Sequence, residues 1–358
     1  MRRVSLMLST LLLATTLHAD VSLVERLQVG KDKPEHANRI SRATGSQMLV
    51  DAAGLEYFIN TNITFSTSSS ASGAASEASF TGPVSATTSG GGTVSTTLND
   101  AFDGYNTLCL STSTTATCET GNAAFTIYNQ NGAATLDGSC SNRQVILPAQ
   151  TVGNVTVQRK VFVPSNDEFA RWANIFTNNG AAPETFNAII ANNLGSDSNT
   201  VIVSSSNGDT TADLTDTWVS TFQNYSGTTS SDPRLGHVLQ GAGAPTGLNG
   251  INFADGDDNP FWSYSVTLAP GETKIILNYV TGQASKADAN AKATELAGLP
   301  ANALQCLSPA EVSQVANFLT AAPEPVEAPT LSTYGAVALA LMLGGFAVLL
   351  LRRRNAQA

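Results

Sequence analysis

The sequence contains little histidine and little charge, and both shortages exclude classes of function. Three histidines and 13% charged residues occur among 358 positions. His36 and His237 are the histidines that remain once a predicted signal peptide is removed. No Gly-x-Ser-x-Gly nucleophile elbow accompanies them, so the sequence does not support a serine hydrolase triad. Histidine-rich metal sites are excluded for the same reason.

Basic residues are also scarce. The chain has 18 lysines and arginines against 28 aspartates and glutamates, which gives a net charge of −10. Two arginines lie in the predicted signal peptide and three in the C-terminal tail, so the exported part keeps 13 basic residues and a net charge of −15. Because such a surface repels phosphate backbones, we exclude nucleic acid as a partner.

Cysteine is limited to four residues, an even number that suits an oxidising compartment. Their spacing contains no C-x-x-C pair, which favours disulfides over a zinc site. Three pairings are possible. We favour the one that closes a short Ser/Thr-rich hairpin and ties the C-terminal helices to the body, namely Cys109 with Cys118 and Cys140 with Cys306.

The N-terminus has the three parts of a secretory signal peptide. Arg2-Arg3 form a basic region, Val4 to Leu17 an apolar region, and Leu17-His18-Ala19 a small-residue cleavage site. We therefore predict a signal peptide over residues 1–19 and a mature chain that begins near Asp20, outside the cytoplasm.

The C-terminus predicts a membrane anchor. A proline-rich stalk and a short motif occupy residues 321–332, and an apolar stretch from Ala336 to Leu351 follows. The stretch is at the short end of what crosses a bilayer, and the arginines after it would stay on the cytoplasmic side. We expect a transmembrane helix and basic tail over residues 333–358, with the membrane as one partner.

The motif and the basic tail together resemble the IPTL-CTERM protein-sorting tail of bacteria, which is related in design to the PEP-CTERM tail. The residues that carry the resemblance are Pro329, Thr330, Leu331, Ser332, Tyr334 and Gly335, followed by Arg352, Arg353 and Arg354. The resemblance implies a sorting or processing enzyme as a partner, and delivery to the cell surface or beyond. The alternative is a plain anchor that keeps the protein in the inner membrane.

Between these ends, residues 20–320 predict an all-β ectodomain. Val152 to Val163 alternates apolar and polar residues, and further short strands are separated by turn signals, as in a large sandwich. Pro270-Gly271 predicts a tight turn that joins two strands in a hairpin. Two short helices close the body, one over Ser285 to Leu296 and one that begins at Ser308. We expect the second helix to present Val312, Val315, Ala316 and Leu319 on one face.

Short segments of the body resemble an uncharacterised bacterial surface β-domain. They include Arg159 to Pro164, Leu194 to Asp197, Ser206 to Asp209 and Leu268 to Glu272. The resemblance implies a sandwich, or a double sandwich of the galactose-mutarotase kind, and no particular activity.

Acidic clusters supply the candidate sites. Asp255, Asp257 and Asn259 place oxygen atoms at alternate positions around a glycine, as calcium loops do, but Val266 stands where such loops need a glutamate. An acidic surface turn is the alternative. Asp209, Asp213 and Asp216 form a second loop of this kind.

One further set of residues suggests a carbohydrate site. Asp167 and Glu168 lie close to Trp172, so an acid is near an aromatic platform. We interpret Trp172, Trp218 and Trp262 as core residues, because each lies in a strand-like run.

Three functions remain open. The first is a structural or adhesive role at the cell surface or envelope, without catalysis and without a cofactor. The second is a carbohydrate-binding module for surface glycan, with calcium and an exposed Trp262. The third is a glycan-active enzyme that uses Asp167 and Glu168.

Overall fold

The computed structural model describes the folded body and leaves most of both termini out. The described residues are 47–59, 78–87, 93–98, 101–102, 104–112, 125–128, 134–194, 199–223, 234–257 and 259–320, with Met342 and Arg352; for 78–87 and 93–98 the backbone alone is described. The predicted signal peptide, the stalk at 321–332 and the motif residues from Pro329 to Gly335 lie outside these ranges.

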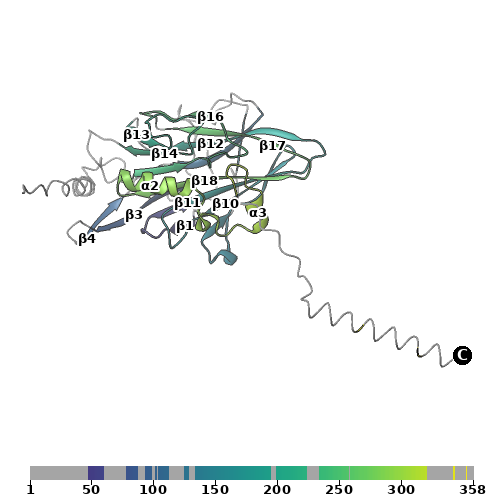
Figure 1. Ribbon diagram of the computed structural model, residues 1–358, viewed down its shortest axis with the longest axis horizontal. Coiled ribbons are helices and arrows are strands. Elements are labelled where there is room, and N and C mark those ends of the chain that lie inside the picture. Colours follow the sequence, from purple (N-terminus) through teal and green to yellow (C-terminus); the bar gives the residue numbers. More distant parts are fainter. Residues whose placement is uncertain are drawn as a thin grey trace, which may run out of the picture. The chain divides into compact units, whose positions relative to one another are not determined.

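A nine-stranded antiparallel sheet forms one layer (Figure 1). Its strands, in spatial order, are β13 (Thr200–Ser205), β14 (Trp218–Gln223), β15 (Arg234–Val238), β18 (Thr273–Gln283), β11 (Ala170–Asn178), β10 (Val155–Phe162), β8 (Gln144–Ile146) and β7 (Thr135–Leu136), with β9 (Gln150–Val152) paired to β10.

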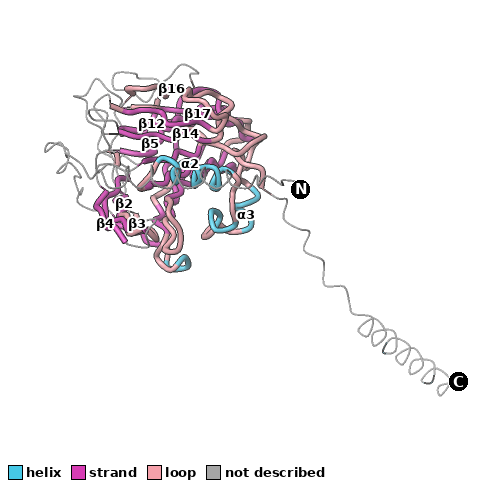
Figure 2. Tube along the Cα trace, turned by 60° about the vertical axis from the view of Figure 1, so that its left-hand side comes forward, coloured by secondary structure: helices cyan, strands magenta, loops and turns pink. Residues whose placement is uncertain are grey.

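A five-stranded antiparallel sheet forms the second layer, and Figure 2 shows its strands lying side by side. They are β16 (Leu248–Asn252), β17 (Phe261–Leu268), β12 (Glu184–Asn193), β5 (Gly104–Ser111) and β6 (Thr126–Ile127). A smaller sheet contains β1 (Gln47–Val50), β2 (Glu56–Ile59), β3 (Ala78–Thr87) and β4 (Thr93–Leu98).

The main core lies between the two large sheets, which makes the body the predicted β-sandwich. Trp172 and Val280 of the nine-stranded sheet belong to the same buried cluster as Trp262 and Tyr264 of the five-stranded sheet. Each of these side chains is fully buried. Side chains of alternate residues point to opposite faces of a strand, so one face of each sheet supplies this core.

A second core covers the other face of the nine-stranded sheet. Helix α2 (Lys286–Ala297) packs on β14, β15 and β18, as Figure 1 shows. The remaining short elements are η1 (Gly138–Cys140), η3 (Ala301–Leu304) and α3 (Pro309–Ser313). Ile275, Leu277 and Tyr279 of β18 lie in one cluster with Leu296 of α2 and Phe318. The sheet is thus buried on both faces at its centre.

The two predicted helices form, but the second is shorter than expected. Ser285 caps α2 at the amide of Asp288, which confirms that start. Ser308 and Glu311 form the predicted capping box of α3. That helix ends at Ser313, however, and Val315 pairs as a parallel bridge with Ile275. Leu319 is 64% exposed, so the expected four-residue apolar face does not exist.

Two strand predictions are corrected by the sheet topology. β17 and β18 lie in different sheets, so Pro270-Gly271 joins two layers instead of closing a hairpin. Gly271 has φ +74°, as a type II turn requires, and such a turn serves either connection. The predicted strand from Val152 to Val163 is divided by a two-residue turn at Gly153-Asn154, where Gly153 has φ +60°.

The predicted transmembrane helix is not supported. No helix among the described residues is long and apolar enough to cross a membrane. The 12-residue α2 reaches about 18 Å at about 1.5 Å per residue, against about 30 Å of hydrocarbon, and it carries lysine, aspartate and glutamate.

Candidate functional site

The one histidine among the described residues is locked inside the sandwich. His237 of β15 is fully buried, with Nδ1 2.8 Å from the Tyr105 hydroxyl and Nε2 2.9 Å from the Thr221 hydroxyl. Burial lowers the pKa of His237 to about 3, because the charged form loses its hydration. The imidazole is therefore neutral at physiological pH and acts as a structural hydrogen-bonding group.

The three tryptophans are core residues, as predicted. Trp172 and Trp262 are fully buried and Trp218 is 8% exposed. Both Trp172 and Trp262 pack against the Tyr105 ring, at centroid distances of 5.1 and 6.3 Å. A glycan platform on the surface therefore cannot use Trp262.

The candidate calcium loop holds a sheet edge together. The Asp255 carboxylate accepts a 2.7 Å hydrogen bond from the Ile202 amide, and the Gly256 amide donates to the Thr200 carbonyl at 2.8 Å. Asp257 accepts from the Asn259 amide at 2.9 Å. Within the ranges that the structure describes, no three acidic, histidine or cysteine side chains gather as a metal site. These contacts attach the loop to β13.

The second acidic loop is also engaged with its own backbone. Asp216 is fully buried and accepts from the Ser206 hydroxyl and the Asp213 amide, both at 2.9 Å. Hydrogen bonds from Thr215 lower the pKa of Asp213. Asp209 accepts from the Thr211 amide at 2.8 Å. Each carboxylate stabilises the turn between β13 and β14.

Asp167 and Glu168 contact the structure's own side chains. Asp167 forms an ion pair with Lys292 of α2 and accepts a hydrogen bond from Asn302. Glu168 accepts from the Gln283 side chain at 2.9 Å. The two carboxylates thus hold α2 and η3 against the sheet.

Asp51 is a buried carboxylate that the sequence did not single out. It lies in the turn between β1 and β2 and accepts from the Ala53 and Leu55 amides at 2.9 and 3.0 Å. Burial raises the pKa of Asp51 to about 7, although these amide bonds act in the opposite direction. Its signal in the sequence is weak, since an aspartate before Ala-Ala-Gly predicts only a turn.

The segment that ends the body, residues 301–318, is fastened to the nine-stranded sheet at several points, and we call it the C-terminal strap. The predicted disulfide Cys140–Cys306 is present, with a Cα–Cα distance of 5.5 Å. Cys109 is also disulfide-bonded, and its predicted partner Cys118 lies outside the described residues. Arg171, fully buried, donates to the Ala303 and Gln305 carbonyls at 2.9 and 2.7 Å.

Asn317 completes the attachment by acting as a strand residue would. Its side chain accepts from the Leu277 amide at 2.8 Å and donates to the Leu277 carbonyl at 2.6 Å. The backbone around it adds bonds from the Ile275 amide to the Gln314 carbonyl and from the Ala316 amide to the Ile275 carbonyl, both 2.9 Å. The strap therefore occupies the edge of β18 that β15 leaves open.

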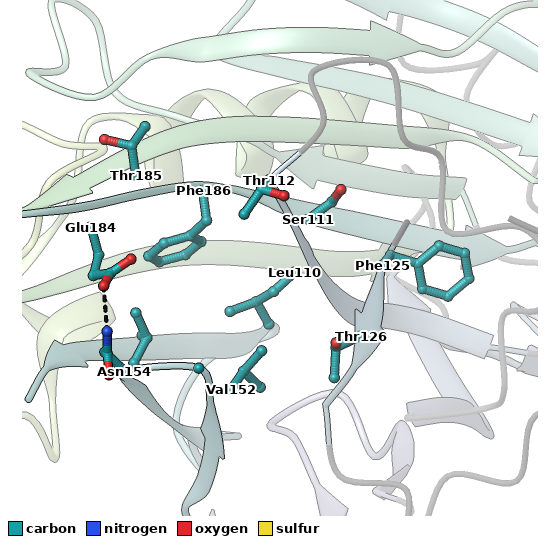
Figure 3. A pocket seen from close by; sticks show the side chains of 12 residues that line it. Leu110, Ser111, Thr112, Phe125, Thr126, Val152, Asn154, Glu184, Thr185 and Phe186 are labelled. Atoms are coloured by element: carbon teal, nitrogen blue, oxygen red, sulfur yellow. Dashed lines mark hydrogen bonds between the residues drawn. The ribbon is translucent and has the colours of Figure 1, made fainter. Parts of the chain in front are cut away.

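A pocket lies where the two large sheets meet, beside the β9–β10 turn (Figure 3). Its volume is about 360 Å³, and its walls come from the ends of β5, β6 and β12 and from the turn. The lining residues are Leu110, Ser111, Thr112, Phe125, Thr126, Val152, Gly153, Asn154, Val155, Glu184, Thr185 and Phe186.

The pocket has an apolar floor and a polar pair at its side. Leu110, Val152 and Phe186 point toward one another in Figure 3. The Asn154 amide donates to the Glu184 carboxylate at 2.7 Å, which links the β9–β10 turn to the start of β12. Sequence reasoning missed this pair because its members lie 30 positions apart. The available signal was Gly153-Asn154, a turn dipeptide inside an alternating run.

The comparisons with known proteins show no family. No family model matches the chain, and no curated protein matches it. Among solved structures, a polysaccharide lyase has a TM-score of 0.33 at 14% identity, covering 55% of this chain and 28% of its own. A putative kojibiose phosphorylase from the human microbiome has a TM-score of 0.40 at 12% identity, covering 76% of this chain and 35% of its own.

A galactose mutarotase-like protein from Lactobacillus casei has a TM-score of 0.35 at 9% identity, covering 67% of this chain and all of its own. This chain therefore spans about a third of the length of the first two structures. All three scores are below 0.5, so these similarities carry no argument about activity.

Proposed function

We propose that this chain is an exported cell-envelope protein whose β-sandwich body has a structural or adhesive role at the surface, without catalysis. Its C-terminal tail carries the sorting-like motif, through which a sorting or processing enzyme would deliver the body to the surface and hold it there. The observation that supports this role best is the fastening of the C-terminal strap, because a body held by its tail is pulled at residue 320.

The strap suits such a tether. A pull on residue 320 first meets the bonds of Asn317 and Ala316 with β18, and behind them the Cys140–Cys306 disulfide. The disulfide lies behind these bonds and is covalent, so the strap stays linked to the sheet when residues 307–320 are pulled. Disulfides of this kind persist in oxidising compartments, which agrees with export.

The candidate catalytic acids favour the same proposal. Asp167 forms an ion pair with Lys292, and Glu168 is hydrogen-bonded to Gln283. Hydrolysis of a glycan needs two carboxyl groups that face a sugar ring from opposite sides. Both groups here are engaged in holding helix α2 and the adjacent sheet.

Peptide mapping of the native protein tests this proposal. The termini and the disulfides are identified by mass spectrometry in cytoplasmic, envelope and medium fractions. We expect a chain that begins near Asp20, contains the Cys140–Cys306 peptide and ends near Pro329-Thr330 at the surface or in the medium. A reduced chain in the cytoplasm with Met1 in place would refute export, and an intact C-terminus at Ala358 would refute tail processing.

A further inference from the structure

We propose that the pocket between the β9–β10 turn and the start of β12 binds a neutral saccharide unit. Asn154 and Glu184 are the groups that take its hydroxyls. The proposal goes beyond the structural role above, since it assigns a ligand class to a specific site. It uses neither the calcium-like loop nor a tryptophan.

The polar pair has hydrogen-bonding capacity left after its own contact. Asn154 uses one of two amide hydrogens in the 2.7 Å bond to Oε1 of Glu184. Among the described residues the second hydrogen has no acceptor and remains a donor, and Oε2 of Glu184 likewise remains an acceptor at the pocket wall. A donor beside an acceptor matches two adjacent hydroxyl groups, one of which accepts while the other donates. This pattern is the chemistry of a sugar ring edge.

The floor suits the apolar face of the same ring. Phe186 is 6% exposed and is held by Phe176, with ring centroids 5.2 Å apart. Leu110 and Val155 belong to the main core, which keeps the floor rigid. A preformed apolar floor with a few placed polar groups is the usual form of a small-molecule site, and about 360 Å³ falls in the usual size range.

The charge of the lining selects a neutral ligand. The lining residues include one carboxylate, from Glu184, and among those that the structure describes there is no lysine, arginine or histidine. The exposed hydroxyls of Thr112 and Thr126 add neutral partners at the rim. An anionic sugar would meet the Glu184 charge without a compensating cation, so we expect it to be rejected.

Saturation-transfer NMR titration of the mature, disulfide-bonded protein tests the site. The probes are maltose, cellobiose, lactose and N,N′-diacetylchitobiose, with digalacturonic acid as the anionic counterpart. We expect at least one neutral probe to bind saturably in the millimolar range or tighter, and digalacturonic acid to bind at least about tenfold more weakly.

Two variants and one control locate the binding. Glu184→Gln replaces a charged acceptor and is expected to raise Kd about tenfold, and Thr126→Val removes one rim hydroxyl and is expected to raise Kd about fivefold. Glu295→Gln alters an exposed carboxylate on α2, paired with Lys292, and is expected to leave Kd unchanged. Thermal unfolding of each variant verifies that the fold is retained.

The proposal is overturned if no neutral probe binds, if digalacturonic acid binds better, or if Kd is the same in both pocket variants as in the wild type. Any of these results leaves the export proposal untouched, because that proposal is tested by peptide mapping.

Discussion

β17 and β18 are consecutive in the chain, yet β17 is fully buried on one face and most of β18 is buried on both. In β17 the buried residues Trp262, Tyr264 and Val266 alternate with half-buried or exposed ones. In β18 every residue from Ile275 to Gln283 is buried. Among the described residues, β17 beyond Phe261 packs against the opposite sheet alone, and Phe261 joins a small cluster with Ile189 and Ala191 on the outer face. β18 has the opposite sheet on one side and α2 with the strap on the other.

A strand of this sandwich is therefore buried on both faces where a third layer covers its sheet, and membership in a sheet alone does not bury both faces. Antiparallel sheets with one solvated face show alternation, and doubly covered strands show continuous apolar runs. Ile275-Ile276-Leu277 is such a run, so the sequence already indicates the position of the extra layer. The strap supplies part of that layer, which makes it part of the fold.

The largest test of this comparison removes the covalent attachment of the extra layer. Replacing both Cys140 and Cys306 with serine is expected to lower the free energy of unfolding by about 4 kcal/mol, because the disulfide closes a loop of 166 residues. Urea unfolding at pH 7 measures the difference, with the reduced wild type as a second reference. A loss below about 1 kcal/mol would show that the strap adds little.

The pH dependence of stability compares two regions, because His237 between the large sheets and Asp51 in the β1–β2 turn titrate with effects of opposite sign. The unfolded pKa of His237 is about 6.5 and the folded one about 3, so its stability contribution is complete above pH 6.5 and is lost as pH falls. The pKa of Asp51 rises from 3.8 to about 7 on folding, so its contribution is complete below pH 3.8 and is lost as pH rises through 7.

The variants separate these contributions. Asp51→Asn keeps the acceptor for the Ala53 and Leu55 amides and is expected to be more stable than wild type at pH 8, by on the order of 3 kcal/mol, with the gain vanishing near pH 4. In this variant stability should fall steeply below pH 6.5, owing to His237. His237→Gln should remove that acid slope. Urea midpoints between pH 4 and pH 8 measure both, and parallel pH profiles for all three proteins would contradict the assignment.

A smaller loss of unfolding free energy is expected when the Asn317 side chain, which hydrogen-bonds the backbone of β18, is removed. Asn317→Ala removes both bonds to Leu277 and one to the Leu239 carbonyl, and is expected to cost about 2 kcal/mol. Thermal or urea unfolding measures the loss. An unchanged midpoint would mean that Asn317 does not hold the strap.

The smallest effect is predicted on the solvated face. Ser265 of β17 is exposed, so Ser265→Ala should change the free energy of unfolding by less than about 0.5 kcal/mol. It serves as the matched control for Asn317→Ala in the same assay. A loss as large as that of Asn317→Ala would show that this face is covered in solution.

Local chemistry predicted the parts of the fold that local chemistry controls. Ser308 and Glu311 form their capping box, and Ser285 starts α2. The pairing of Cys140 with Cys306 was predicted as the one that remains once Cys109 is paired with the nearby Cys118. The β-sandwich followed from short strands and turns. The turn at Pro270-Gly271 was predicted, but not its use, because a type II turn joins strands of one sheet or of two.

The remaining features depend on contacts between distant residues. Val315 leaves a helical pattern to pair with Ile275, 40 positions away in the chain, since burial against β18 outweighs helix propensity. Arg171 is charged yet buried, and the carbonyls that satisfy it come from the strap. The pocket pair Asn154 and Glu184 meets only when the β9–β10 turn lies beside β12. No pattern of neighbouring residues in the sequence predicts these contacts.

Native-state hydrogen exchange of the strap tests the central claim most directly. The amides of Ala316 and Leu277 report its bonds with β18, and the amide of Trp172 reports the centre of the sheet. We predict that Ala316 and Leu277 exchange with an opening free energy within about 1 kcal/mol of that of Trp172, because strap and sheet unfold together. Exchange of the strap amides at a free energy several kcal/mol lower, with Trp172 still protected, would show that the strap is a loosely attached appendage.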